Sequence, residues 1–557
     1  MKRIGLSTTL VLAVVLTLAL LALAPAQGST AATAPSAGLV RISNAPHVAA
    51  APAMASMTVG ISAEPAGLDP ALVDYDPTAF FVTSQVYETL VTVEPDTALA
   101  LPGLAQSWSV SADGLTWTFT LRTGVTFHDG TALNAAAVRF NLERWWDPAH
   151  PYHNGDFAYF DYLFGGFRDD PTCLITDISS TGTSQVRITL RHAYSPLPSM
   201  LATPWFAIAS PTAIQAGTLD HHPVGTGPFR FGAWTAGDSI RLDAAAAYRG
   251  PASRVSPLTF KILPDPAARL AALQANTIQV VADLPIGQLP AVVADPRLRV
   301  AYRPASSVGY VGINRSHAGL DNPLVRRAIA HAMNKPAVLA SHYAANAQVA
   351  TQLLPPGMWG RDPGIVDYTH DVALARSLLT QAGYPNGFST TLALRDVVRD
   401  YLPDPIGTAN AIHADLAAAG IQAEVLVYDS PTFLAKLANG ELDLYLLGWY
   451  PDYPHPANYL DTLFCQYSSD FGPRDEMLCQ AMERALAATS LPAQLTEYQW
   501  ASRRVHDTLP MIPLAHARSM RVERRDVLGI QASPLGYDDY AMAGYTAARR
   551  YLPLVMR

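Results

Sequence analysis

The sequence predicts an α/β protein of two lobes, the first sheet-rich and mixed and the second a compact α/β unit. Three observations support this fold class. The first half of the chain combines strand patterns with turns, strands and helices alternate at short spacing from about residue 308, and no tandem repeat is found. With 557 residues, of which 49% are apolar, the chain is long enough for several folding units.

The strand patterns of the first half come before and after one clear helix. Large apolar and polar residues alternate over residues 115–122, which is typical of a half-buried strand. Asn134 is a good N-cap for a helix that ends near Trp145. A second strand pair is predicted around residues 185–190 and 229–242, with a turn inside the latter segment.

The second half alternates strands with helices. Residues 308–313 form a predicted strand, and Asn322 and Pro323 cap and start the helix that follows. Because the connections are short, a mainly parallel sheet is expected. The further predicted elements are a helix at 372–381, a helix that stops at Gly420, a strand at 423–427, a helix at 431–438 and a strand at 442–447.

The charge of the chain excludes some partners. Its formal net charge is −8 and its pI is about 6.0, and it contains no long basic run. Such a chain has no general electrostatic reason to bind nucleic acid or an anionic membrane surface. We therefore expect neither partner, and we expect a monomer.

The N-terminus predicts export. Lys2 and Arg3 precede an apolar stretch at residues 10–23, and small residues follow it. This is the arrangement of a secretory signal peptide, and the stretch is shorter than the roughly 20 apolar residues of a membrane-spanning helix. We expect a signal peptide at residues 1–26 and a flexible tether rich in Ala, Pro, Ser and Thr at residues 27–56. No cysteine comes directly after the stretch, so a lipid anchor on an N-terminal cysteine is not expected.

Three cysteines follow the predicted signal peptide. In an exported protein a pair of cysteines is more often bridged than bound to metal. Cys465 and Cys479 flank a short polar loop and are the expected disulfide pair. Cys173 is expected to be a buried, small apolar residue.

A loop at residues 447–456 is the most informative segment for function. It follows the predicted strand 442–447 and contains Trp449, Tyr450 and Tyr453 around one carboxylate, that of Asp452. Aromatic rings around a single acid, just past the C-terminal end of a strand, suit an open α/β cleft that holds a cationic group. The alternative is a rigid loop whose rings fill the core.

Motifs for several kinds of catalysis are missing from the sequence. It contains no Gly-x-Ser-x-Gly elbow, phosphate-binding loop, dinucleotide fingerprint or His-Glu-x-x-His zinc helix. His221 and His222 are adjacent and are expected to be loop residues rather than metal ligands. We expect no enzymatic activity, no cofactor and no metal site, with an exported hydrolase or a surface protein as the alternative class.

Several segments, in this order along the chain, together resemble one family, the solute-binding proteins of dipeptide and oligopeptide ABC transporters (extracellular solute-binding protein family 5). They begin with a segment that runs from Leu-Ala-Gln-Ser-Trp to Phe-His-Asp-Gly, and they include Pro-Val-Gly-Thr-Gly-Pro-Phe and Asn-Pro-Leu-Val-Arg-Arg-Ala-Ile-Ala-His-Ala-Met. The resemblance covers about residues 57–545. The segments lie at residues 104–130, 223–229, 322–333, 382–388 and 447–456.

The resemblance implies a two-lobed periplasmic-binding-protein type II fold with an enlarged, sheet-rich first lobe. Both chain ends belong to that lobe in the family, so the chain is expected to cross between the lobes near residues 304–307 and 511–516. This gives lobe I at residues 57–305, lobe II at 306–514 and a return to lobe I at 515–557. The implied mechanism is closure of the lobes around a ligand that contacts both.

The resemblance also implies a ligand site. In peptide-binding members, an acid that corresponds to Asp452 pairs with the α-amino group of the ligand, and a nearby tryptophan corresponds to Trp449. The family usually has a further acid where this chain has His455. No arginine matches a family motif for the ligand carboxylate, so Arg303, Arg395 and Arg399 are open candidates, each with an ordinary surface role as the alternative.

The implied function is that of an exported substrate-binding receptor, at the periplasmic or extracellular face of the membrane, for peptide transport. It would capture small peptides, with Asp452, Trp449, Tyr450 and Tyr453 as ligand-binding residues, and deliver them to an ABC permease and ATPase complex. The alternative ligands for the same fold are a nickel complex, an oligosaccharide or an opine.

Overall fold

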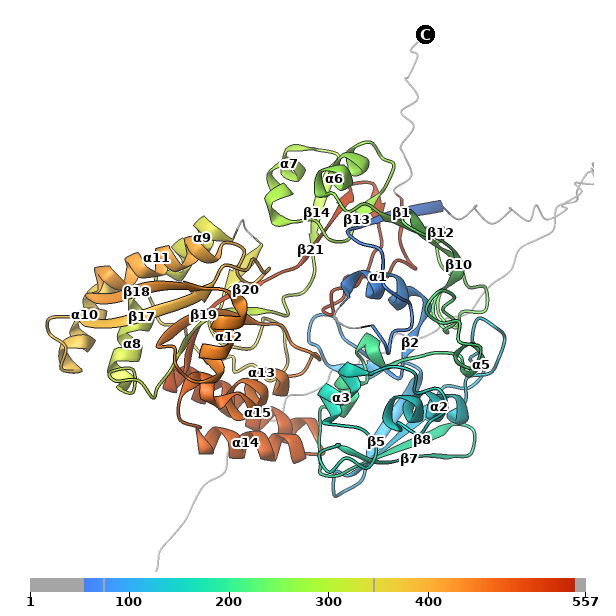
Figure 1. The fold of residues 1–557 in the computed structure, drawn as a ribbon, viewed down its shortest axis with the longest axis horizontal. Coiled ribbons are helices and arrows are strands. Elements are labelled where there is room, and N and C mark those ends of the chain that lie inside the picture. Colours follow the sequence, from blue (N-terminus) through green and yellow to red (C-terminus); the bar gives the residue numbers. More distant parts are fainter. Residues whose placement is uncertain (1–54, 74–75, 344–345, 546–557) are drawn as a thin grey trace, which may run out of the picture. The chain divides into compact units, whose positions relative to one another are not determined.

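Two large β-sheets organise the chain (Figure 1). This computed structural model describes residues 55–73, 76–343 and 346–545. We call the part built on a seven-stranded sheet lobe I and the part built on a six-stranded sheet lobe II. The predicted signal peptide, 1–26, and nearly all of the predicted tether, 27–56, lie outside the described residues.

The seven-stranded sheet of lobe I has the strand order β10-β11-β12-β1-β13-β21-β14. Strand β1 pairs in parallel with β12 and β13, whereas the other pairings are antiparallel. The strands are β1 (Ala55–Ile61), β10 (Phe229–Thr235), β11 (Ser239–Ala244), β12 (Val255–Ile262), β13 (Val280–Val281), β14 (Leu298–Tyr302) and β21 (Met520–Arg524).

A four-stranded antiparallel sheet with the order β5-β6-β8-β7 completes the main sheets of lobe I. Residues in β6 (Thr116–Leu121) alternate between buried and half-buried positions, as the predicted strand at 115–122 requires. The other strands are β5 (Ala105–Val110), β7 (Ile175–Thr181) and β8 (Gln185–Leu190), and the two-stranded pairs are formed by β2 (Glu88–Thr89) with β9 (Ala207–Ile208), β3 (Val91–Val93) with β4 (Ala100–Pro102), and β22 (Val527–Leu528) with β23 (Gly544–Tyr545).

The predicted strand pair at 185–190 and 229–242 is wrong. Residues 185–190 form β8, which pairs with β6 and β7. Residues 229–242 cover β10, a turn and most of β11, in the seven-stranded sheet. The alternation of apolar residues identifies which face of a strand is buried, but it does not identify the strand's partner.

The helices of lobe I start where polar side chains cap them. Asn134 accepts a hydrogen bond from the Ala137 amide at the start of α2, as predicted, and Asp76 caps α1 in the same way. The helices are α1 (Pro77–Val86), α2 (Ala135–Trp146), α3 (Ala158–Phe164), α4 (Leu197–Met200), α5 (Pro211–Gln215), α6 (Pro266–Gln274) and α7 (Leu289–Ala294), with short 3₁₀ turns η1 (Pro204–Phe206) and η2 (Ile286–Gln288).

The sheet of lobe II is mixed rather than mainly parallel. Its order is β16-β20-β15-β19-β17-β18, and only the β17–β18 and β17–β19 pairings among these six strands are parallel. The parallel part is the region where helices separate consecutive strands, as the prediction assumed. Strands β15 and β20 enter and leave the lobe and pair antiparallel with their neighbours. The strands are β15 (Val308–Ile313), β16 (Ala347–Val349), β17 (Phe388–Arg395), β18 (Ile421–Tyr428), β19 (Leu444–Trp449) and β20 (Met511–Ala517).

Helices flank this sheet and continue beyond β19 (Figure 1). None of the helices in the described ranges combines the length and apolar character needed to cross a membrane. They are α8 (Pro323–Ala332), α9 (Lys335–His342), α10 (Val372–Gln381), α11 (Pro405–Ala418), α12 (Ser430–Ala438), α13 (Ala457–Asp461), α14 (Glu476–Ala487) and α15 (Leu491–Thr508), with a π-helical turn η3 (Thr462–Gln466) and a 3₁₀ turn η4 (Ser468–Phe471).

The chain crosses between the lobes twice. The first crossing, residues 303–307, joins β14 to β15, and the second, residues 518–519, joins β20 to β21. The expected return at 515 falls inside β20, because pairing of β20 with β15 and β16 continues to Ala517. The two crossings lie side by side, since the Arg303 amide donates to the Ser519 carbonyl at 2.9 Å.

A histidine–aspartate pair lies next to β19, and we expect it to make the stability of lobe II dependent on pH. His317 Nδ1 contacts Asp443 Oδ1 at 2.5 Å, and Asp443 Oδ2 accepts a hydrogen bond from the Thr391 amide of β17 at 2.9 Å. Burial alone lowers the pKa of His317, but hydrogen bonds to Asp443 and to the Gly440 carbonyl outweigh it and raise that pKa above its usual value.

Because its pKa is higher in the folded state, protonated His317 stabilises the fold fully below the unfolded value of about 6.5, and this contribution is lost as the pH rises through the folded pKa. We expect His317→Gln to remove this step, which is below about 1 kcal/mol because the pair is partly exposed to solvent. The measurement is the free energy of unfolding by urea at pH 6 and pH 9 for both proteins. An equal decline in the two proteins would contradict the assignment.

Candidate functional site

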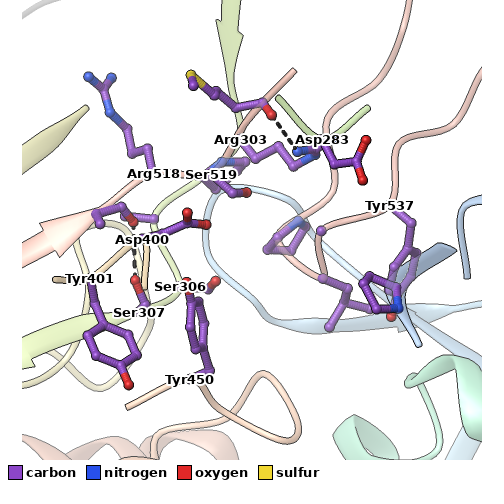
Figure 2. A pocket seen from close by; sticks show the side chains of 18 of the residues that line it. Asp283, Arg303, Ser306, Ser307, Asp400, Tyr401, Tyr450, Arg518, Ser519 and Tyr537 are labelled. Carbon is purple, nitrogen blue, oxygen red and sulfur yellow. Dashed lines mark hydrogen bonds between the residues drawn. The ribbon is translucent and has the colours of Figure 1, made fainter. Parts of the chain in front are cut away.

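A cavity of about 1190 Å³ lies between the lobes and is lined by both of them. Lobe I contributes aromatic rings and acids, lobe II contributes the loops that follow β17 and β19, and the two crossings form one wall (Figure 2). The lining residues used below are Trp205, Arg303, Arg399, Asp400, Tyr401, Trp449, Tyr450 and Asp452.

The backbone that delivers the loop is tightly packed. Strand β19 extends two residues beyond the predicted end at Leu447, so Trp449 is its last residue and pairs with Val308 of β15. Gly448 lies against the ring of Tyr401, and a Cβ atom at this position would overlap the ring carbons. Glycine is therefore required where the strand enters the cavity wall.

Asn458 at the start of α13 fixes Asp452. The Asp452 amide donates to Asn458 Oδ1 at 2.9 Å, and Asn458 Nδ2 donates back to Asp452 Oδ2 at 3.2 Å. Asn458 Oδ1 also accepts a hydrogen bond from Trp449 Nε1 at 3.1 Å. One buried asparagine thus sets the positions of both the carboxylate and the indole.

The environment of Asp452 favours a cationic ligand. Burial raises the pKa of Asp452, and hydrogen bonds from Asn458 and Tyr162 oppose that rise. Among the described residues, no Lys, Arg or His side chain contributes to its pKa. A ligand cation would therefore supply the missing countercharge, and the ring of Trp449 beside it could add cation–π attraction.

Tyr450 also lines the cavity, where it contacts a second acid. Its ring lies 5.1 Å from that of Tyr401, and Figure 2 shows its hydroxyl directed toward Asp400. Burial raises the pKa of Asp400, and a hydrogen bond from Tyr450 opposes the rise.

Tyr453 is not a lining residue of this cavity. It is 4% exposed and packs into the apolar core of lobe I, and its hydroxyl lies 2.8 Å from that of Tyr194. The predicted role of Tyr453 in ligand binding therefore does not match its position. Its ring instead joins the loop of lobe II to lobe I.

His455 is also outside the cavity lining. Its ring packs edge-on against Trp359, with centroids 4.8 Å apart, and against Tyr498 at 5.6 Å. Burial lowers its pKa to about 3, so the imidazole is neutral at physiological pH. His455, at the position where the resemblance implied a further acid, therefore contributes nothing to the cavity lining.

The three candidate arginines have different positions. Arg303 lines the cavity, but it is buried and forms a bidentate ion pair with Asp538, with Nη2 to Oδ2 at 2.8 Å. Arg395 is not a lining residue and donates to the Ser430 hydroxyl at 3.3 Å. Arg399 is exposed and lines the cavity, and its guanidinium donates to the carbonyl of its neighbour Val398 at 3.0 Å.

The cysteines are placed in lobes II and I. The structure joins Cys465 in η3 to Cys479 in α14 by a disulfide, with Cα atoms 5.6 Å apart. Cys173 is a free, buried thiol in lobe I. His221 and His222 lie in a surface turn, and no cluster of three or more potential metal ligands is found within the described ranges.

Two polar residues of the site were not predicted from the sequence. Asn458 lies two residues after the loop at 447–456. An asparagine near the start of a helix often hydrogen-bonds neighbouring backbone groups, so its contact with the loop could have been predicted. Tyr162 donates from its hydroxyl to Asp452 Oδ2 at 3.2 Å. It is 290 residues away in the sequence, and nothing in the local pattern around it indicates this contact.

Residues 100–471 match the model of a protein family described as "Bacterial extracellular solute-binding proteins, family 5 Middle". The dipeptide-binding protein of Escherichia coli K12 is 31% identical over an alignment of 490 positions, which covers 85% of this chain and 91% of that protein. Heme-binding protein A of Haemophilus influenzae is 32% identical over an alignment of 499 positions, which covers 86% of this chain and 90% of that protein.

Solved structures agree in fold. HbpA2 from Haemophilus parasuis superposes with a TM-score of 0.82 at 29% identity, covering 88% of this chain and 100% of that one. The dipeptide-binding protein of Pseudoalteromonas sp. SM9913 in complex with Met-Leu has a TM-score of 0.66 at 28% identity, with 88% and 100% covered. This chain belongs to the bacterial extracellular solute-binding proteins of family 5 and has their two-lobed fold.

Proposed function

We propose that this protein is the extracytoplasmic receptor of an ABC importer and that its ligands are short peptides with a free amino group. The observation that carries the proposal is Asp452, a partly buried carboxylate on the cavity wall next to Trp449, whose pKa no Lys, Arg or His of the described residues affects. The names of relatives support the class of ligand, since they include dipeptide- and di/tripeptide-binding proteins.

The amino end of the peptide would pair with Asp452. An ammonium group gains a charge-assisted hydrogen bond there and attraction to the indole of Trp449. Tyr450 would lie along the peptide, because its ring also lines the cavity. Closure of the lobes would follow from contacts that the ligand makes with both of them.

Arg399 is the best candidate for the carboxylate end of the peptide. We expect Arg399→Gln to weaken the binding of a dipeptide by at least about tenfold. The substitution removes the charge-assisted hydrogen bond between the guanidinium and the ligand carboxylate, and it leaves that carboxylate desolvated without a partner. A C-terminally amidated dipeptide should lose little further affinity in the variant. Calorimetry with both ligands measures the effect.

Arg395→Gln is the matched control, since Arg395 is an arginine of the same lobe that does not line the cavity. It should bind like the wild type. If Arg399→Gln also bound both ligands like the wild type, another cation would hold the carboxylate.

Heme is a second candidate ligand, because the relative from Haemophilus influenzae is named for it. Heme has no ammonium group, so its binding would not depend on Asp452. Native mass spectrometry of the purified protein, followed by calorimetry with dipeptides and with heme, distinguishes the two. A co-purified peptide, or dipeptide binding that needs the free amine, supports the proposal, whereas heme binding alone would replace it.

The proposal also covers the location of the protein in the cell and its transport partner. The protein would be exported by a signal peptide at residues 1–26 and would act as a monomer outside the cytoplasmic membrane, without a lipid on an N-terminal cysteine. Its partner would be a permease and ATPase complex that accepts the closed, ligand-bound form. No catalytic step is part of this function.

A further inference from the structure

Tyr162 belongs to lobe I and hydrogen-bonds Asp452, the carboxylate that binds the ligand's amino group in the proposed function. It lies on the short helix α3, at the edge of lobe I that is nearest to α13 in Figure 1. Its neighbours Phe160 and Phe164 are buried in the core of lobe I, whereas Tyr162 is 50% exposed. The helix is therefore anchored by one face and presents the phenol on the other.

An aromatic series supports this phenol. The ring of Tyr159 stacks on that of Trp205, with centroids 3.7 Å apart, and meets the ring of Tyr162 edge-on at 6.1 Å. Trp205 lines the cavity and donates from its indole to the Val73 carbonyl at 3.0 Å. Tyr162 is thus held in place by the same elements that form the wall of the cavity in lobe I.

The two oxygens of Asp452 are not equivalent. Oδ2 accepts hydrogen bonds from both Tyr162 and Asn458, each at 3.2 Å. Neither of these two hydrogen bonds goes to Oδ1. Two donors on one oxygen, one from each lobe, orient the carboxylate and leave Oδ1 for a third donor.

We propose that Tyr162 is a positioning residue for the ligand's amino group, because its hydrogen bond to Oδ2 of Asp452 directs Oδ1 toward the ammonium. This inference rests on the proposed function of Asp452 and extends it to lobe I. The phenol can donate to the carboxylate before the ligand arrives, so less ordering is left to the binding step. The amino-group site is therefore completed by both lobes.

The positioning role of Tyr162 can be measured through the pH dependence of ligand binding. Tyr162 is the titratable group that hydrogen-bonds Asp452, and Tyr467 in turn lies beside Tyr162. Burial, followed by the charge of Asp452, raises the pKa of Tyr162. A donor to the carboxylate favours its ionised form, so loss of the Tyr162 hydroxyl should raise the pKa of Asp452. The acidic limb of ligand binding would then move to higher pH.

The test compares four proteins by calorimetry with one free-amine dipeptide between pH 4.5 and pH 7. They are the wild type, Tyr162→Phe, Asp452→Ala and the double variant. We expect Tyr162→Phe to weaken binding by about tenfold, which is the scale of one hydrogen bond to a charged group. Its acidic limb should move upward in pH, and it should have no further effect in the Asp452→Ala background, which lacks the acceptor.

Tyr194→Phe is the matched control, because it removes another phenol hydrogen bond between the lobes, that with Tyr453, away from the cavity lining. Its acidic limb should stay in place. Equal losses in Tyr162→Phe and Tyr194→Phe without a shift in pH dependence, or an undiminished loss in the Asp452→Ala background, would overturn the inference. Failure of the proposed function would look different, because Asp452→Ala would then bind the dipeptide as well as the wild type.

Discussion

Asp452→Asn is expected to weaken the binding of a free-amine peptide by at least about 30-fold. Truncation of one partner in a buried charged pair costs roughly 2–5 kcal/mol, much of it from the charge that is left unpaired. The asparagine keeps the shape and can still accept from Asn458, so the fold should be retained. Calorimetry with the same dipeptide measures the loss, and thermal unfolding checks the fold.

The N-acetylated form of the dipeptide is the control ligand for this variant. It should bind weakly to the wild type, because it has no ammonium group, and it should lose little more in Asp452→Asn. Equal affinity of the two proteins for the free-amine peptide would exclude Asp452 as the anchor. A sugar or a metal complex would then become the better candidate ligand.

Asp538→Asn is expected to reduce the free energy of unfolding by about 3–5 kcal/mol, which is the usual effect of removing one partner from a buried ion pair. The Asp538 carboxylate is fully buried and accepts two hydrogen bonds from Arg303, at 3.0 and 2.8 Å. Arg521 lies 3.3 Å from the same carboxylate. The variant would leave a buried guanidinium beside the crossings between the lobes without its full countercharge.

Asp243→Asn is the matched control for stability. It breaks an ion pair with Arg241 on the exposed face of β11, and such pairs contribute about 1 kcal/mol or less. Denaturant unfolding of both variants and the wild type gives the comparison. Equal effects of the two substitutions would show that the buried pair contributes no more than a surface pair.

The fold was predictable where local patterns determine it. Residues 308–313 and 372–381 form a strand and a helix with the predicted bounds, because apolar spacing and caps are local properties. The direction of strands in lobe II was predicted wrongly, since strand–helix alternation constrains only β17, β18 and β19. The antiparallel strands β15 and β20 follow from the crossings, which no local pattern encodes.

Only the part of the ligand site that belongs to the loop at residues 447–456 could be predicted from the sequence. Trp449, Tyr450 and Asp452 lie together on the cavity wall because they follow each other at the end of β19. Tyr453 belongs to the same loop, but backbone geometry directs its ring into lobe I. Tyr162 reaches Asp452 only through the packing of two lobes, which the sequence pattern does not reveal.

Arg303 illustrates the same limit for charged residues. As an arginine in the first crossing, it was an open candidate for the ligand carboxylate, with a surface role as the alternative. Arg303 lines the cavity, but it is not a surface residue, since it is 4% exposed and paired with Asp538 from the last described part of the chain. The partner is 235 residues away, so the pairing depends on the return of the chain to lobe I.

The most direct test of the account is a crystal structure of the protein with a bound free-amine dipeptide. The account predicts that the dipeptide lies in the cavity between the lobes, with its amino nitrogen about 3 Å from Asp452 Oδ1 and Tyr162 still donating to Oδ2. A dipeptide that is bound there with its amino nitrogen away from Asp452, and with another group paired to that carboxylate, would contradict it.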